Sequence, residues 1–150
     1  MENLVMSELI SKNVIMMDLE VNNKDEVMCT LARSIEKDER LNGYNGFLKA
    51  VYDREATFPT SIGYGFAIPH GKSDYVKKST IAFARLKNEI CWSEDEMVRY
   101  VFMIAVPEKE AGDTHLKVLS QLSRSIMREE FRLSLKEAKT VDEIMRVLTF

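Results

Sequence analysis

Two largely apolar runs, Ile81 to Leu86 and Val98 to Val106, constrain the fold more than any other feature of the chain. Neither run shows the strict alternation of apolar and polar residues that is typical of a strand with one face in water. Continuous runs of this length suit strands that are buried on both faces, as in a sheet covered by helices on each side. The chain is therefore expected to form an α/β domain with layered architecture.

Amphipathic segments that fit helices interleave with these strands. Asn23 and Glu26 have the spacing of an N-cap pair and precede apolar residues at four-residue spacing, which predicts a helix over about 24–38. A second helix is expected from Phe47 and ends near Glu55. Helices and strands in alternation favour a single layered domain with a mixed sheet.

Further capping and breaking signals divide the rest of the chain. Asp113 or Thr114 can cap a helix, and Thr140 with Glu143 forms a capping box before a last helix. Two further short strands are expected at residues 14–17 and 62–68.

Composition and charge exclude several classes of function. The chain has 150 residues, which is the size of one domain, and a net charge of −3 with no basic patch, so binding to nucleic acid is not expected. The longest apolar run, Tyr100 to Val106, is far too short to cross a membrane. The N-terminus carries Glu2 and Glu8 and lacks the apolar core of a signal peptide, which favours the cytoplasm.

Two cysteines, Cys29 and Cys91, have no metal-like spacing. Free thiols in a reducing compartment are the preferred interpretation. A catalytic cysteine is the alternative, but neither residue has basic surroundings that would stabilise a thiolate.

The segment from Ile62 to Gly71, Ile-Gly-Tyr-Gly-Phe-Ala-Ile-Pro-His-Gly, holds one of the two histidines in the chain. Its glycines do not form a dinucleotide-binding fingerprint, because no third glycine follows at the required step and no helix opens there. His70 follows a strand-like stretch, and an imidazole is a good nucleophile near neutral pH. A merely structural histidine in a turn is the alternative.

Three residues could form a phosphohistidine site. A nucleophilic imidazole at His70 could take a phosphoryl group, and a guanidinium at Arg54 could grip its oxygens. His115 stands at the expected start of a helix, where backbone N–H groups favour an anion. Each signal has a plain alternative, namely a helix-end charge for Arg54 and a local hydrogen-bonding residue for His115.

The arrangement as a whole resembles a known family. Residues 54–71, Arg-Glu-Ala-Thr-Phe-Pro-Thr-Ser-Ile-Gly-Tyr-Gly-Phe-Ala-Ile-Pro-His-Gly, resemble the signature of the fructose/mannitol-type enzyme IIA domain of the bacterial phosphoenolpyruvate-dependent sugar phosphotransferase system. Residues 114–122, Thr-His-Leu-Lys-Val-Leu-Ser-Gln-Leu, are similar to the second-histidine helix of the same family. The resemblance extends over essentially the whole chain and implies one enzyme IIA type 2 domain at 1–150, with a mixed β-sheet and helices on both faces.

The resemblance also implies roles. His70 falls on the phosphorylated position, Arg54 on the arginine that holds the phosphoryl group, and His115 on the supporting histidine. Thr60 and Gly71, in the same motif, are candidates for supporting the bound phosphoryl group. The implied donor is phospho-HPr and the implied acceptor is a cysteine of an enzyme IIB. No cofactor is expected, because the histidine itself carries the group, and any association with the membrane would run through other transporter components.

Two rival interpretations remain at this stage. The same domain type also serves as a regulatory switch of the nitrogen-related branch, in which phosphorylation sets partner binding and no sugar moves. A metal site at His70 and His115 is the other, but two histidines without carboxylate or thiol ligands make a poor site.

Overall fold

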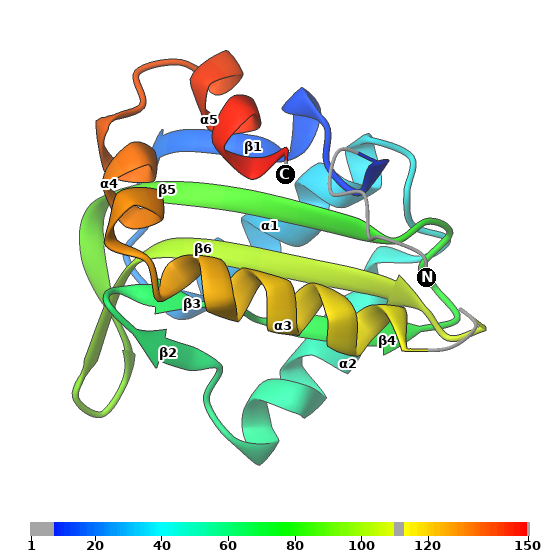
Figure 1. Cartoon of the computed structure of the whole chain (residues 1–150). Coiled ribbons are helices and arrows are strands. Elements are labelled where there is room, and N and C mark those ends of the chain that lie inside the picture. Colours follow the sequence, from blue (N-terminus) through cyan, green and yellow to red (C-terminus); the bar gives the residue numbers. More distant parts are fainter. Residues whose placement is uncertain (1–7, 110–112, 150) are drawn as a thin grey trace.

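The computed structural model describes residues 8–109 and 113–149 (Figure 1). In chain order the elements are the 3-10 helix η2 (Lys12–Val14), β1 (Ile15–Leu19), α1 (Lys24–Lys37), α2 (Tyr44–Thr57), β2 (Ser61–Gly63), β3 (Phe66–Ala67), β4 (His70–Ser73), β5 (Thr80–Ser93), β6 (Glu96–Pro107), α3 (Thr114–Ile126), α4 (Glu129–Glu137) and α5 (Val141–Leu148).

The strands form one mixed sheet of six strands. Its order is β1-β5-β6-β3-β2, and β4 pairs with β6 beyond the end of β3. β5 and β6 are antiparallel, β1 runs parallel to β5, and both β3 and β4 run parallel to β6. β6 is therefore the strand that aligns β3 and β4.

Helices cover both faces of the sheet. α1 and α2 lie behind the sheet in Figure 1, and α3, α4 and α5 lie in front of it. Residues 80–86 of β5 and 100–106 of β6 are buried throughout, with Phe83 and Phe102 packed ring against ring at the centre. The predicted α/β layered fold, with central strands buried on both faces, is confirmed.

The predicted helix caps of α1 and α5 are confirmed. The Asn23 side chain accepts a hydrogen bond from the Glu26 N–H, and Thr140 Oγ1 accepts one from the Glu143 N–H. At α3 the N-cap residue is Asp113, and its side chain makes no capping hydrogen bond. Cys29 and Cys91 are free thiols, as expected.

The structure corrects three expectations about the elements. The strand expected at 62–68 is two short strands separated by a turn, in which Gly63, Tyr64 and Gly65 all have positive φ. Left-handed backbone at consecutive residues cannot continue a strand. α2 is longer than expected, and α4 was not expected at all, because its short sequence buries only Phe131 and Leu135.

Within residues 8–109 and 113–149, no helix has both the length and the apolar character needed to span a membrane.

Candidate functional site

His70 is the first residue of β4 rather than part of a turn, and its side chain is 7% exposed. Its Nδ1 lies 2.8 Å from the carbonyl oxygen of Ile68. A carbonyl oxygen can only accept, so in the neutral ring Nδ1 carries the hydrogen and Nε2 carries the lone pair. The backbone carbonyl thereby selects the tautomer in which Nε2 is the nucleophilic atom.

The two residues before His70 are held by backbone hydrogen bonds. The Ile68 N–H donates to the Thr60 carbonyl, and the Ile104 N–H donates to the Pro69 carbonyl. His70 pairs with Ile104 in the parallel β4–β6 ladder. The sheet thus fixes the position of the imidazole from both sides.

His115, the second residue of α3, meets His70 edge to face. The two ring centroids are 4.8 Å apart and the ring planes are inclined by 84°. β4 and the start of α3 are distant in sequence, and the fold places them together at the lower right of Figure 1. The two histidines singled out from the sequence therefore form one pair.

Both imidazoles are neutral at pH 7. Burial lowers the pKa of His115 to about 4, with further lowering by His70, Lys72 and Arg54. Burial also lowers the pKa of His70, an effect that Arg54 reinforces and that the Ile68 hydrogen bond and Glu55 partly oppose. A neutral ring keeps the lone pair that a nucleophile needs.

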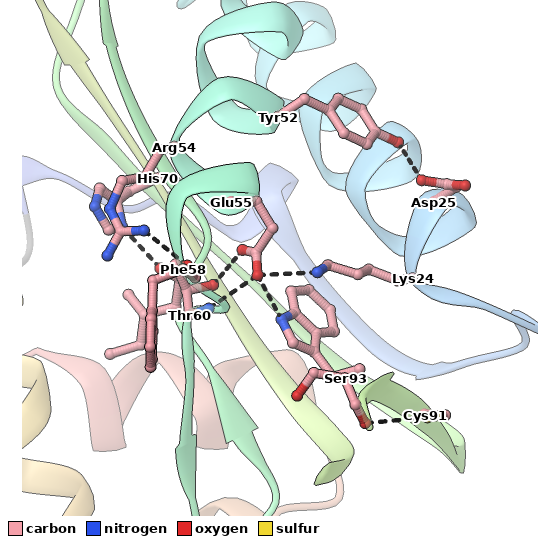
Figure 2. A network of polar contacts seen from close by, with 12 residues as sticks. Lys24, Asp25, Tyr52, Arg54, Glu55, Phe58, Thr60, His70, Cys91 and Ser93 are labelled. Atoms are coloured by element: carbon pink, nitrogen blue, oxygen red, sulfur yellow. Dashed lines mark hydrogen bonds and ion pairs between the residues drawn. The ribbon is translucent and has the colours of Figure 1, made fainter. Parts of the chain in front are cut away.

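Arg54 lies in the last turn of α2, and its guanidinium stands beside the His70 ring in Figure 2. One Nη donates to the Phe58 carbonyl at 2.8 Å. In the described part of the chain, this is the single hydrogen bond that the Arg54 side chain makes. The rest of its fork of donors is therefore available to an anion at the imidazoles.

Glu55 is a buried carboxylate that ties this region together, with 6% exposure. It accepts hydrogen bonds from Lys24 Nζ at 2.9 Å, Trp92 Nε1 at 3.0 Å, and both the N–H and the hydroxyl of Thr60 (Figure 2). Burial alone would raise the pKa of Glu55, but the hydrogen bonds from Thr60 and Lys24 outweigh it and the pKa is lowered. An ionised Glu55 therefore holds the loop between α2 and β2.

From the sequence, Glu55 is identified only as the expected end of a helix and as one residue of the family motif. The available signal was its spacing from Val51, because residues four apart lie on one face of a helix. A charged residue on a buried face requires partners, and here it has four donor atoms. Lys72, a cation that acts on His115, was also missed.

Thr60 and Gly71 frame the site without presenting a free side-chain donor to it. The Thr60 hydroxyl donates to Glu55. A Cβ on Gly71 would lie 3.0 Å from Val51 Cγ2 and 3.1 Å from the Val51 backbone nitrogen, so only glycine lets β4 approach α2 this closely. Gly71 follows His70 directly in the chain, and the Thr60 carbonyl accepts a hydrogen bond from the Ile68 N–H, two residues before His70.

The site combines a neutral nucleophile, a second imidazole and nearby cations. Arg54, Lys72 and the N-terminus of α3 all favour negative charge. Glu55, the carboxylate that acts on the pKa of His70, is already paired with Lys24. Two large apolar side chains, Phe58 at 71% exposure and Leu116 at 67%, flank Arg54 and His115 in sequence and face solvent. The arrangement favours an anionic group beside the two imidazoles.

In the described residues, no cluster of three potential ligands could hold a metal ion.

Comparisons with known proteins show which family this chain resembles. The protein-family model described as phosphoenolpyruvate-dependent sugar phosphotransferase system, EIIA 2, matches residues 8–150. The fructose-specific EIIA component of the phosphotransferase system from Haloferax volcanii is 40% identical over 111 residues, which are 73% of this chain and 71% of that protein.

A longer relative and a solved structure extend the comparison. The fructose-specific EIIABC component from Bacillus subtilis is 36% identical over 144 residues, which are 95% of this chain and 22% of that protein. The chain thus spans about a fifth of the length of this relative. The crystal structure of nitrogen regulatory protein IIA-Ntr from Neisseria meningitidis has a TM-score of 0.87 at 28% identity, covering 95% of this chain and 98% of that one.

Proposed function

Since the chain belongs to the EIIA 2 family of the phosphoenolpyruvate-dependent sugar phosphotransferase system, we propose that it carries a phosphoryl group on Nε2 of His70. It is a phosphotransferase component by family. We further propose that residues 1–150 act as one cytoplasmic enzyme IIA domain that receives the group from phospho-HPr and passes it to a cysteine of an enzyme IIB. The geometry of His70 supports this proposal most strongly.

The transfer step uses the groups already in place. Nε2 attacks the phosphorus of the donor, the new N–P bond forms, and the bond from phosphorus to the donor breaks. Nε2 carries no hydrogen, so the attack requires no general base, and Nδ1–H keeps its hydrogen bond to the Ile68 carbonyl. In the second half, the acceptor thiolate attacks the same phosphorus and Nε2 leaves with its electron pair restored.

Arg54 and His115 hold the charge of the transferred group in this scheme. The free N–H groups of the Arg54 guanidinium are placed to bind phosphoryl oxygens. His115 faces the same ring from the start of α3 and can donate from its own imidazole. Thr60 and Gly71 act indirectly, the former by binding Glu55 and the latter by letting β4 sit against α2.

The direct test is transfer in a reconstituted mixture of enzyme I, HPr and phosphoenolpyruvate. The protein should gain the mass of one phosphoryl group, and His70→Ala should gain none. Arg54→Ala should slow transfer by about 100-fold, the scale seen when one anion-binding donor is removed. The control is Arg124→Ala, which changes an exposed arginine in the last turn of α3. Normal labelling of His70→Ala would remove His70 from this role.

We infer the sugar class from the names of the relatives. The curated relatives from Haloferax and Bacillus are both named fructose-specific, and we propose fructose/mannitol-type uptake on that basis. The name of the Bacillus relative also combines components A, B and C, which supports an enzyme IIB as acceptor. Transfer from the phosphorylated chain to a fructose-type enzyme IIB, and on to fructose in the presence of enzyme IIC, would test this choice.

The likeness to nitrogen regulatory protein IIA-Ntr favours a second candidate function. In this case the phosphorylation state of His70 would control binding to a target protein, and no sugar would be transported. A chain that accepts the phosphoryl group but passes it to no enzyme IIB in a mixed assay would support the switch over uptake.

A further inference from the structure

A second pocket lies away from His70, where the turn between β2 and β3 meets the β5–β6 hairpin and α4. Its volume is about 360 Å³. In the sheet, Phe66 pairs with Tyr100 and His70 pairs with Ile104, so the pocket is about 13 Å along β6 from the imidazole at strand spacing. The phosphoryl-transfer chemistry uses none of its lining residues.

Three cations line this pocket, Arg99, Arg132 and Lys136. No ion pair joins any of them to a carboxylate anywhere in residues 8–109 or 113–149. The two carboxylates of the lining, Glu89 and Glu129, are exposed, whereas the two arginines are half-buried. Water screens the carboxylates more than the arginines, so the interior of the pocket favours an anion.

The arginines are held by contacts that leave donors free. Arg99 donates through Nε to the Leu86 carbonyl at 3.0 Å, and its two Nη groups make no hydrogen bond within the described residues. Arg132 donates one Nη to the Ile126 carbonyl at 2.6 Å, and its guanidinium carbon lies 3.9 Å from the centroid of the Tyr64 ring. Guanidinium groups fixed in this way are preorganised for the oxygens of a phosphate.

Tyr64 adds an aromatic surface to the pocket, and its backbone adopts a disfavoured left-handed conformation. Its φ is +57°, between Gly63 at +97° and Gly65 at +82°, and the residue is 56% exposed. A bulky residue in the left-handed region is disfavoured, and such strain concentrates where a side chain must be displayed for binding. The glycine-tyrosine-glycine turn thus presents a ring at the mouth of a cationic pocket.

We propose that this pocket binds a small phosphate ester, with the phosphate on the free donors of Arg99 and Arg132, Lys136 beside them, and the organic part against Tyr64. Nucleotides and sugar phosphates share the phosphate that these cations recognise. The proposal is independent of phosphoryl transfer at His70, because the two sites share no residue.

The test is a titration of the ¹⁵N-labelled protein followed by amide chemical shifts, with AMP, ribose 5-phosphate, adenosine and inorganic phosphate as probes. AMP and ribose 5-phosphate should shift the amides of Tyr64, Gly65, Arg99 and Arg132. Adenosine should not, since it lacks the phosphate. Tighter binding of AMP than of ribose 5-phosphate would assign the Tyr64 ring to a base, and equal binding would assign the site to sugar phosphates.

Substitutions of the lining residues test whether the ester binds in this pocket. Arg132→Gln should weaken binding by about tenfold or more, the loss expected for a hydrogen bond to a charged group. Because Arg132 also bonds the end of α3, Lys136→Gln serves as a second variant whose side chain makes no hydrogen bond or ion pair in residues 8–109 and 113–149. Arg124→Gln is the matched control and should bind like the parent, as should His70→Ala.

Three results would overturn the proposal. These are the absence of shifts from either ester at millimolar concentration, equal weakening by Arg124→Gln and Arg132→Gln, and binding of adenosine as strong as that of AMP. Inorganic phosphate that bound as well as the esters and remained unaffected by Arg132→Gln and Lys136→Gln would also overturn it.

Discussion

Two regions along β6, one at Ile104 and one at Tyr100, have positive charge nearby that serves different purposes. At Ile104 the strand supports a buried histidine whose tautomer is set by a backbone carbonyl and whose surroundings are fixed by the Glu55 network. At Tyr100 it supports a pocket with three cations, of which the two arginines donate to backbone carbonyls, and an exposed tyrosine on a strained turn. A covalent carrier needs one neutral atom held in place, whereas a reversible anion site needs several charged donors left unpaired.

Among variants that test this comparison, the largest change in stability is expected for Glu55→Ala. Glu55→Ala removes the acceptor for Lys24, Trp92 and Thr60 and should lower the free energy of unfolding by about 3 kcal/mol, because it leaves buried donors without partners. Urea unfolding at pH 7 measures this. Glu36→Ala, at an exposed ion pair with Arg33, is the control and should change stability by less than about 1 kcal/mol. Equal effects of the two variants would mean that the Glu55 network does not hold the loop.

The glycines provide the next comparison. Gly71→Ala should destabilise by about 1–3 kcal/mol through overpacking against Val51, and it should slow phosphoryl transfer because it displaces the strand that begins at His70. Gly63→Ala meets no atom within 4 Å and should cost about 1 kcal/mol through its positive φ alone, without affecting transfer. Thermal unfolding and the transfer assay on both variants check this. A transfer defect in Gly63→Ala of the size seen in Gly71→Ala would contradict it.

The last comparison concerns the pH dependence of stability. The pKa of His115 is about 4 in the folded protein and near 6.5 when unfolded, so the unfolded state binds the proton more readily. Stability should therefore fall as pH drops from 6.5 towards 4. His115→Gln should reduce this decline, and an NMR titration should place the His115 pKa directly. A His115 pKa above 6 would contradict the burial of this ring.

Much of the fold was predictable because the signals were local. The runs at 81–86 and 98–106 gave the central strands, and the cap residues Asn23 and Thr140 gave two helix starts. The break at Tyr64 was not predictable, because a tyrosine with positive φ is contrary to its local preference and depends on contacts such as that with Arg132. α4 was missed because two buried side chains are too few for a periodic signal.

The sequence suggests which residues form the candidate site, but it does not reveal their arrangement. Family motifs pointed to His70, Arg54 and His115, but only the fold shows the two rings 4.8 Å apart. The hydrogen bond that selects the His70 tautomer comes from a backbone carbonyl, which no side-chain pattern reveals. The donors around Glu55 come from α1, the α2–β2 loop and β5, so its role appears only when those elements are brought together.

NMR of the phosphorylated, ¹⁵N-labelled protein tests the carrier mechanism most directly, because it identifies which nitrogen bears the phosphoryl group. The structure predicts phosphorus on Nε2 of His70, while Nδ1 keeps its hydrogen and donates it to the Ile68 carbonyl. Phosphorus on Nδ1 of His70, or on His115, would contradict it.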